Sequence, residues 1–89
     1  QNDGEGTFKV HILLDTVNCS PKYSSDVGNI LAKEKGMGAT YWDSMKHREF
    51  SLRSIAKNDC SAIAAAFGGG GHLNAAGFKV PRDHYLAKV

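Results

Sequence analysis

The chain has 89 residues, a length that supports one domain with a modest core. Its formal net charge of +2 is too small for bulk adhesion to a nucleic-acid duplex or an anionic membrane, so any nucleic-acid contact must be local. No apolar run approaches the roughly 20 residues that cross a bilayer, and the N-terminal residues do not resemble a secretory signal. We therefore expect a cytoplasmic protein with no membrane partner.

The chain opens on QNDGEG, a polar stretch that predicts a linker over residues 1–6 and one domain over residues 7–89. Because its first residue is Gln1, we expect it to be a fragment of a longer protein. Apolar residues alternate through TFKVHILL, residues 7–14, which predicts a strand with one buried face. The following stretch, NCSPKYSS, predicts a loop.

A helix is predicted to begin near Ser25 and to end at Gly36. The Ser25 hydroxyl can cap exposed backbone amides, and Asp26 suits the positive first turn. Gly36 can adopt the left-handed conformation that stops a helix. The residues expected on its buried face are Val27, Ile30 and Leu31.

Two alternating runs, residues 39–45 and 49–54, are separated by the charged segment KHR. This pattern predicts an antiparallel hairpin. On the second strand Phe50 and Leu52 point to one face, and Arg53 points to the other.

Asp59 is the predicted N-cap of a short helix over residues 61–67, which the glycines at 68–71 end. Residues 72–76 then predict one helical turn closed by Gly77, before a last strand at residues 78–80. The predicted fold class is α/β, a single small domain with a mixed β-sheet packed by helices in the order β-α-β-β-α-β.

The sharpest functional signal is GGGGHLNAAG, residues 68–77. Without Cβ atoms a ligand can approach the main chain closely, and successive amides can point at one anion. A helical turn at residues 72–76 would add unpaired amides at its N-terminus. A glycine-rich turn chosen for flexibility or for tight packing is the alternative. The residues predicted to bind phosphate in this loop are Gly69, Gly70, Gly71, His72 and Asn74.

Arg53 is the second candidate, because a guanidinium matches phosphate oxygens in a bidentate way and Ser51 and Ser54 flank it. From its position alone, a surface ion pair or coverage of apolar surface by its stem explains this arginine equally well. Tyr41 and Trp42 could stack on bases, but neighbours on a strand face opposite ways, and packing is the favoured reading for both.

The sequence predicts no metal site and no catalytic residue. The four histidines lack the spacing of a His-based site, and the six aspartates are scattered. Cys19 and Cys60 have no CxxC partner, which predicts reduced thiols.

Two motifs together, SLRS (residues 51–54) and FGGGGHLNAAGF (residues 67–78), resemble the C-terminal DHH-associated domain of the first type, whose hallmark is a GGGHxxAAG loop. The segment SDVGN (residues 25–29) is similar to the helix start of that family. The resemblance covers about residues 7–80 and implies that Arg53 and His72, with the amides of residues 69–71, hold a non-scissile phosphate or nucleotide end.

In that family an N-terminal DHH domain binds two divalent ions, usually manganese, and hydrolyses phosphodiester or phosphomonoester bonds. No Asp-His-His motif occurs in this sequence. The resemblance therefore implies a substrate-binding domain whose Mn²⁺ lies in a DHH domain of the same longer chain. The implied partners are that domain and a short single-stranded nucleic acid or phosphorylated nucleotide. The alternative is a non-catalytic RNA-binding module related to the C-terminal domain of alanyl-tRNA synthetases.

Overall fold

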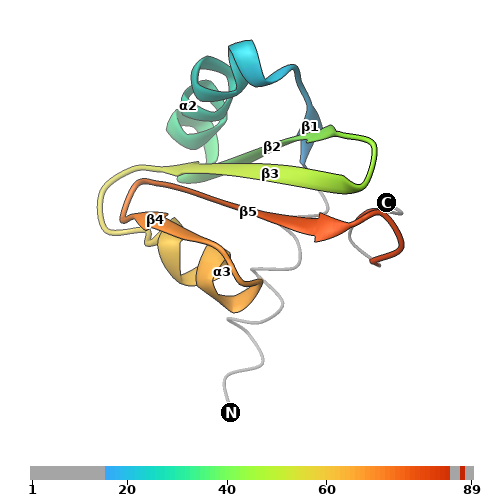
Figure 1. Ribbon diagram of the computed structural model, residues 1–89. Helices are drawn as coiled ribbons and strands as arrows, with labels where there is room; N and C mark the ends of the chain where they lie inside the picture. The colour runs from blue at the N-terminus through green and yellow to red at the C-terminus, as the bar shows by residue number, and fades with distance from the viewer. Residues whose placement is uncertain (1–15, 85–86, 88–89) are drawn as a thin grey trace.

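The computed structural model describes residues 16–84 and residue 87. In this part of the chain a five-stranded mixed sheet has the strand order β1-β2-β3-β5-β4, and one helix lies on each side of it (Figure 1). The strands are β1 (Val17–Asn18), β2 (Met37–Asp43), β3 (His47–Ser54), β4 (Gly70–His72) and β5 (Ala75–Pro81). The helices are the 3-10 turn η1 (Pro21–Tyr23), α2 (Ser24–Lys35) and α3 (Cys60–Ala66). The predicted α/β class is confirmed, and the strand predicted at residues 7–14 lies outside the described residues.

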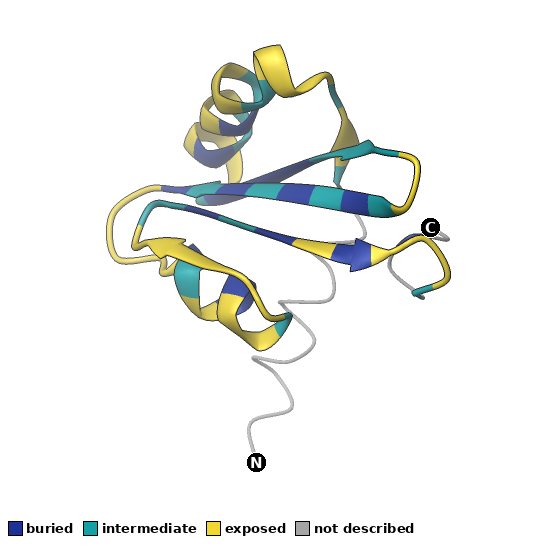
Figure 2. Ribbon diagram, in the orientation of Figure 1, coloured by how far each residue is buried: buried dark blue, intermediate teal, exposed yellow. Residues whose placement is uncertain are grey.

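The sheet is mixed because β1 pairs with β2 in parallel, whereas the other three pairs are antiparallel. The predicted hairpin of β2 and β3 is confirmed. On β3 every second residue is buried, including Phe50 and Leu52, while Ser51 and Arg53 are half-buried on the opposite face (Figure 2). This alternation separates a core face from a second face of the sheet.

The core lies between the sheet and α3. Leu52 and Ile63 are among the largest fully buried side chains, and the ring of Phe78 stacks on those of Phe50 and Phe67 with centroids 4.7 and 4.9 Å apart. Asp59 caps α3 as predicted, since its side chain accepts a hydrogen bond from the backbone N–H of Ser61. Cys19 and Cys60 are free thiols.

The helix α2 ends as predicted, because Gly36 adopts a left-handed conformation with φ of 90° and donates its N–H to the carbonyl of Ala32. Its start near Ser25 is confirmed, and Val27 and Leu31 are half-buried, but the predicted cap and the predicted burial of Ile30 are wrong. Tyr23 precedes the first turn, so Ser25 already lies inside the helix. Ile30 is 57% exposed, and the fully buried residues are Gly28 and Ala32. Small side chains face the sheet because the helix packs closely against it.

The helical turn predicted at residues 72–76 does not form. Gly70 to His72 are strand β4, which forms a hairpin with β5 closed by the pair His72 and Ala75. Five residues are too few to favour an isolated helical turn, whereas β5 offers a row of backbone partners. The glycine run therefore does not present a helix N-terminus to a ligand.

In the described part of the chain no helix is long and apolar enough to cross a membrane.

Candidate functional site

Arg53 and His72 are brought to one face of the sheet by strand register. Arg53 of β3 lies opposite Ala75 of β5, and Ala75 lies opposite His72 of β4. Residues directly opposite one another in antiparallel strands point to the same face. Two strand spacings place the Cα atoms of Arg53 and His72 about 10 Å apart. Ala75, a residue with a small side chain, lies between them.

The Arg53 side chain is held in place by the helix α2. Its Nη2 donates to the hydroxyl of Ser25 over 2.8 Å, and its Nη1 donates to the carbonyl of Leu52 over 2.8 Å. A Cβ on Gly28 would lie 2.9 Å from Cγ of Arg53, so glycine makes room for the arginine stem. A guanidinium has five N–H donors, and others remain available for a ligand.

The segment SDVGN therefore acts on the site through Ser25 and Gly28, two residues that the sequence did not single out as part of it. A glycine inside a helix is unfavourable by about 1 kcal/mol relative to alanine. An unfavourable glycine inside a helix was the sequence signal that could have singled out Gly28. Only the fold shows that this glycine faces Arg53.

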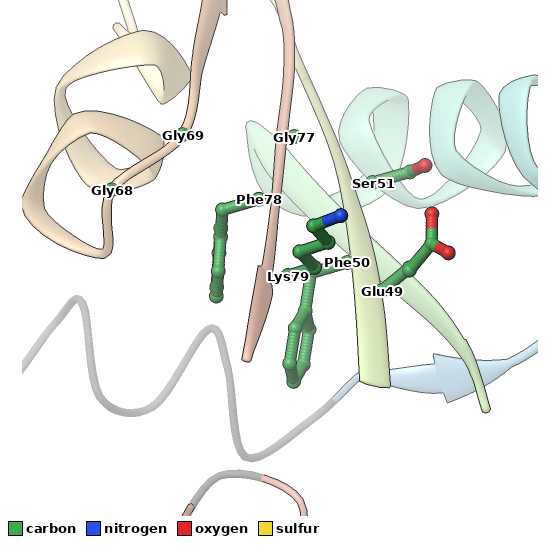
Figure 3. A pocket seen from close by; sticks show the side chains of 8 residues that line it. All are labelled: Glu49, Phe50, Ser51, Gly68, Gly69, Gly77, Phe78 and Lys79. Atoms are coloured by element: carbon green, nitrogen blue, oxygen red, sulfur yellow. The ribbon is translucent and has the colours of Figure 1, made fainter. Parts of the chain in front are cut away.

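Beside these side chains the sheet face is hollowed. An open groove of about 520 Å³ is lined mainly by β3, β5 and the residues just before β4 (Figure 3). Its lining residues are Glu49, Phe50, Ser51, Gly68, Gly69, Gly77, Phe78 and Lys79. Figure 3 shows Ser51, Glu49 and Lys79 projecting from one face of the two strands, whereas Phe50 and Phe78 project from the other.

Gly77 and Gly70 lie on the same face of the sheet as Arg53 and His72. Ser51 lies opposite Gly77, and Gly77 lies opposite Gly70, so that these residues form the row next to that of Arg53 and His72. A Cβ on Gly70 would meet no atom within 4 Å, and Gly70 has no positive φ. Neither packing nor backbone conformation therefore requires glycine at position 70.

The neighbouring glycines serve the hairpin. A Cβ on Gly69 would lie 2.1 Å from the carbonyl oxygen of Gly77, and one on Gly71, whose φ is 149°, would lie 2.5 Å from Cα of Ala76. The N–H of Gly69 donates to the carbonyl of Ala64 over 2.8 Å. Close approach to β5 explains Gly69 and Gly71 without a ligand.

Asn74 also has a structural role. Its side-chain amide donates to the hydroxyl of Ser54 over 2.9 Å and to the carbonyl of Ala56 over 3.3 Å, which ties the β4–β5 turn to the loop after β3. Of the six residues predicted for the site, Arg53, His72 and Gly70 share the open face.

Within residues 16–84 and 87, no group of three or more His, Cys, Asp and Glu residues is placed to hold a metal ion. The arrangement on the open face can bind and orient an anion through a guanidinium, an imidazole and exposed main chain.

The comparison with solved structures says more about the fold than the comparison with related sequences does. The chain has the fold of part of an exopolyphosphatase-related protein from Bacteroides fragilis, with a TM-score of 0.59 and 22% identity over 90% of this chain. The chain covers 31% of that structure. No family model matches the sequence.

One curated relative is the uncharacterized protein R106 of Acanthamoeba polyphaga mimivirus. It is 42% identical over 64 residues, an alignment that takes in 65% of this chain and 15% of the viral protein. The chain thus corresponds to a small part of both longer proteins.

Proposed function

We propose that this chain is the substrate-binding domain of a divalent-metal-dependent phosphoesterase of the DHH family. It would hold a phosphate of a nucleotide or short oligonucleotide while a separate metal-binding domain hydrolyses a phosphodiester or phosphomonoester bond. The main support is the register that aligns Arg53 and His72 across Ala75, next to the bare main chain at Gly70.

The proposed binding mode uses three kinds of contact. Arg53 supplies a fork of donors already oriented by Ser25, which reduces the side-chain entropy that binding must overcome. His72 is exposed on the short strand β4 and can donate from a ring nitrogen. Gly70, two residues from His72 on β4, lets a phosphate approach the main chain beside that side chain.

Structural likeness to an exopolyphosphatase-related protein is consistent with phosphate chemistry. The motifs SLRS and GGGGHLNAAG support the DHH family in particular. The described residues offer no metal cluster, so the proposal assigns Mn²⁺ and the hydrolytic step to the DHH domain of a longer chain.

Chemical-shift titration of the chain with inorganic phosphate and with adenosine monophosphate tests the proposal. We expect the largest shifts at the amides of residues 70–72 and at Nε of Arg53. His72→Ala should weaken binding by about 1.5–3 kcal/mol, the usual loss for a hydrogen bond to a charged group. Shifts concentrated on α3 with a silent β4 would contradict the proposal.

A further inference from the structure

We infer that the hydroxyl of Ser25 is a regulatory phosphorylation site, whose phosphate occupies Arg53 and closes the binding face to other anions. This inference rests on the proposed phosphate site, because it concerns the regulation of that same site. It follows from the packing of α2 beside β3, which places a modifiable side chain against the guanidinium of Arg53.

One face of α2 runs along the whole side chain of Arg53. The Ser25 hydroxyl accepts a hydrogen bond of 2.8 Å from Nη2 of Arg53, at the end of the side chain. Gly28 lies three residues further along the helix and therefore on the same face as Ser25. A Cβ on Gly28 would lie 2.9 Å from Cγ of Arg53, in the stem of the side chain. Two independent contacts thus show that Ser25 faces the arginine.

The hydroxyl of Ser25 can be reached from solvent. Ser25 is exposed, and it contacts Arg53 as an acceptor, which leaves its own proton and a second lone pair available. The preceding serine is different, because Ser24 is half-buried and its hydroxyl donates to the carbonyl of Pro21 over 3.1 Å. Of these two neighbouring serines, Ser25 is the one that combines access with contact to Arg53.

The modification is a phosphoryl transfer from a nucleoside triphosphate, carried out by a separate protein kinase. The serine oxygen forms a bond to the γ-phosphorus, and the bond from this phosphorus to the oxygen that bridges it to the β-phosphate breaks. The hydroxyl proton passes to a base of the kinase, and the nucleoside diphosphate leaves. The phosphoserine then carries a charge of about −1.5 to −2 at pH 7 and three strong acceptor oxygens.

Phosphoserine at position 25 would occupy the arginine that we propose for the ligand. Its oxygens are attached to the atom that already accepts from Nη2 of Arg53, so they lie within reach of the guanidinium and form stronger, charge-assisted hydrogen bonds. Asp26 is exposed, and adjacent residues on a helix do not face each other, so its carboxylate does not stand between the two groups. A phosphate from solution would meet both an occupied guanidinium and a like charge.

Chemical synthesis of the full 89-residue chain with phosphoserine at position 25 tests this inference. We expect the phosphate to shift the Nε resonance of Arg53 and to weaken binding of inorganic phosphate at least about tenfold, because a tethered anion competes at an effective concentration of about millimolar. The matched control carries phosphoserine at position 24, which adds the same charge to the same turn of α2. Screening by salt should limit its effect to less than about threefold.

The outcomes separate regulation from the proposed function. Unchanged phosphate affinity after modification of Ser25 would overturn the regulatory site and leave the phosphate site intact. Equal weakening by modification of Ser24 and of Ser25 would also overturn it, because charge alone would then explain the effect. If the unmodified chain does not bind inorganic phosphate, the proposed function fails and its regulation fails with it. Mass spectrometry of the protein from its own cells should find phosphate on Ser25, and complete coverage of that peptide without phosphate would overturn the inference.

Discussion

The guanidinium of Arg53 is restrained by Ser25 and by the carbonyl of Leu52. These two contacts orient the fork that we propose for phosphate. Lysine would keep the positive charge but would lose both the fork and its anchoring to the helix. The identity of this side chain should therefore matter more than its charge.

We expect Arg53→Lys to weaken phosphate binding by about 1.5–3 kcal/mol, since a charged hydrogen bond is lost. Isothermal titration with adenosine monophosphate measures the change. Arg82→Lys is a matched control, because Arg82 lies beyond the far end of β5 and donates to the carbonyl of Ser44. If Arg53→Lys and Arg53→Ala both bind like the wild type, Arg53 is a surface arginine without a binding role.

Asp43 and Arg48 join the ends of β2 and β3 through two hydrogen bonds of 2.8 and 3.1 Å. The hydrogen bond from Arg48 holds the pKa of Asp43 below its ordinary value of 3.8, against the opposing effect of partial burial. A lowered carboxyl pKa means that the unfolded chain takes up a proton at higher pH than the folded chain does.

The stabilisation from Asp43 should therefore be fully present above about pH 5, and it should be lost as the pH falls through the lowered pKa. Asp43→Asn should reduce stability near neutral pH and flatten the decline between about pH 4 and pH 2. Urea denaturation across this range measures both effects. An unchanged acid slope in the variant would show that other carboxyl groups control acid unfolding.

The β4–β5 hairpin contains glycines of two kinds. Gly71 is required by its positive φ and by its contact with Ala76, whereas Gly70 faces open space. Valine at these positions should therefore have different consequences, and the two variants serve as controls for each other.

Gly70→Val should abolish detectable phosphate binding while changing the free energy of unfolding by no more than about 0.5 kcal/mol. Gly71→Val should destabilise the fold by about 1–3 kcal/mol, because the backbone is strained and the space is filled. Thermal unfolding and phosphate titration of both variants measure these effects. Wild-type binding by a folded Gly70→Val protein would remove the case for main-chain contact with phosphate.

Within residues 16–84 and 87, no cluster of metal-binding side chains accompanies the proposed phosphate-binding face. Two-metal hydrolysis needs ligands that hold two ions about 4 Å apart. We expect this chain alone to leave oligoribonucleotides and dinucleotides intact even with excess manganese. Product chromatography checks this, and activity restored by a separately added DHH domain would support the assignment of roles. Turnover by the chain alone would contradict it.

Local patterns predicted several elements well. Alternation from residue 49 to 54 specified the strand and its two faces, Gly36 marked the end of α2, and Asp59 marked the start of α3. Each of these features depends on neighbours within a few residues, through side-chain period or capping geometry. The assignment of Arg53 and the glycine run to a phosphate site stays a prediction.

Only the tertiary structure decided which of those residues lie on the same face of the sheet. Gly70 and Gly71 are part of strand β4 because β5 pairs with them, and that pairing aligns His72 with Arg53 across Ala75. It also separates Gly70, which faces open space, from Gly71, which packs against β5. Strand order and register depend on contacts between residues far apart in the chain, so no local pattern encodes which side chains share a face.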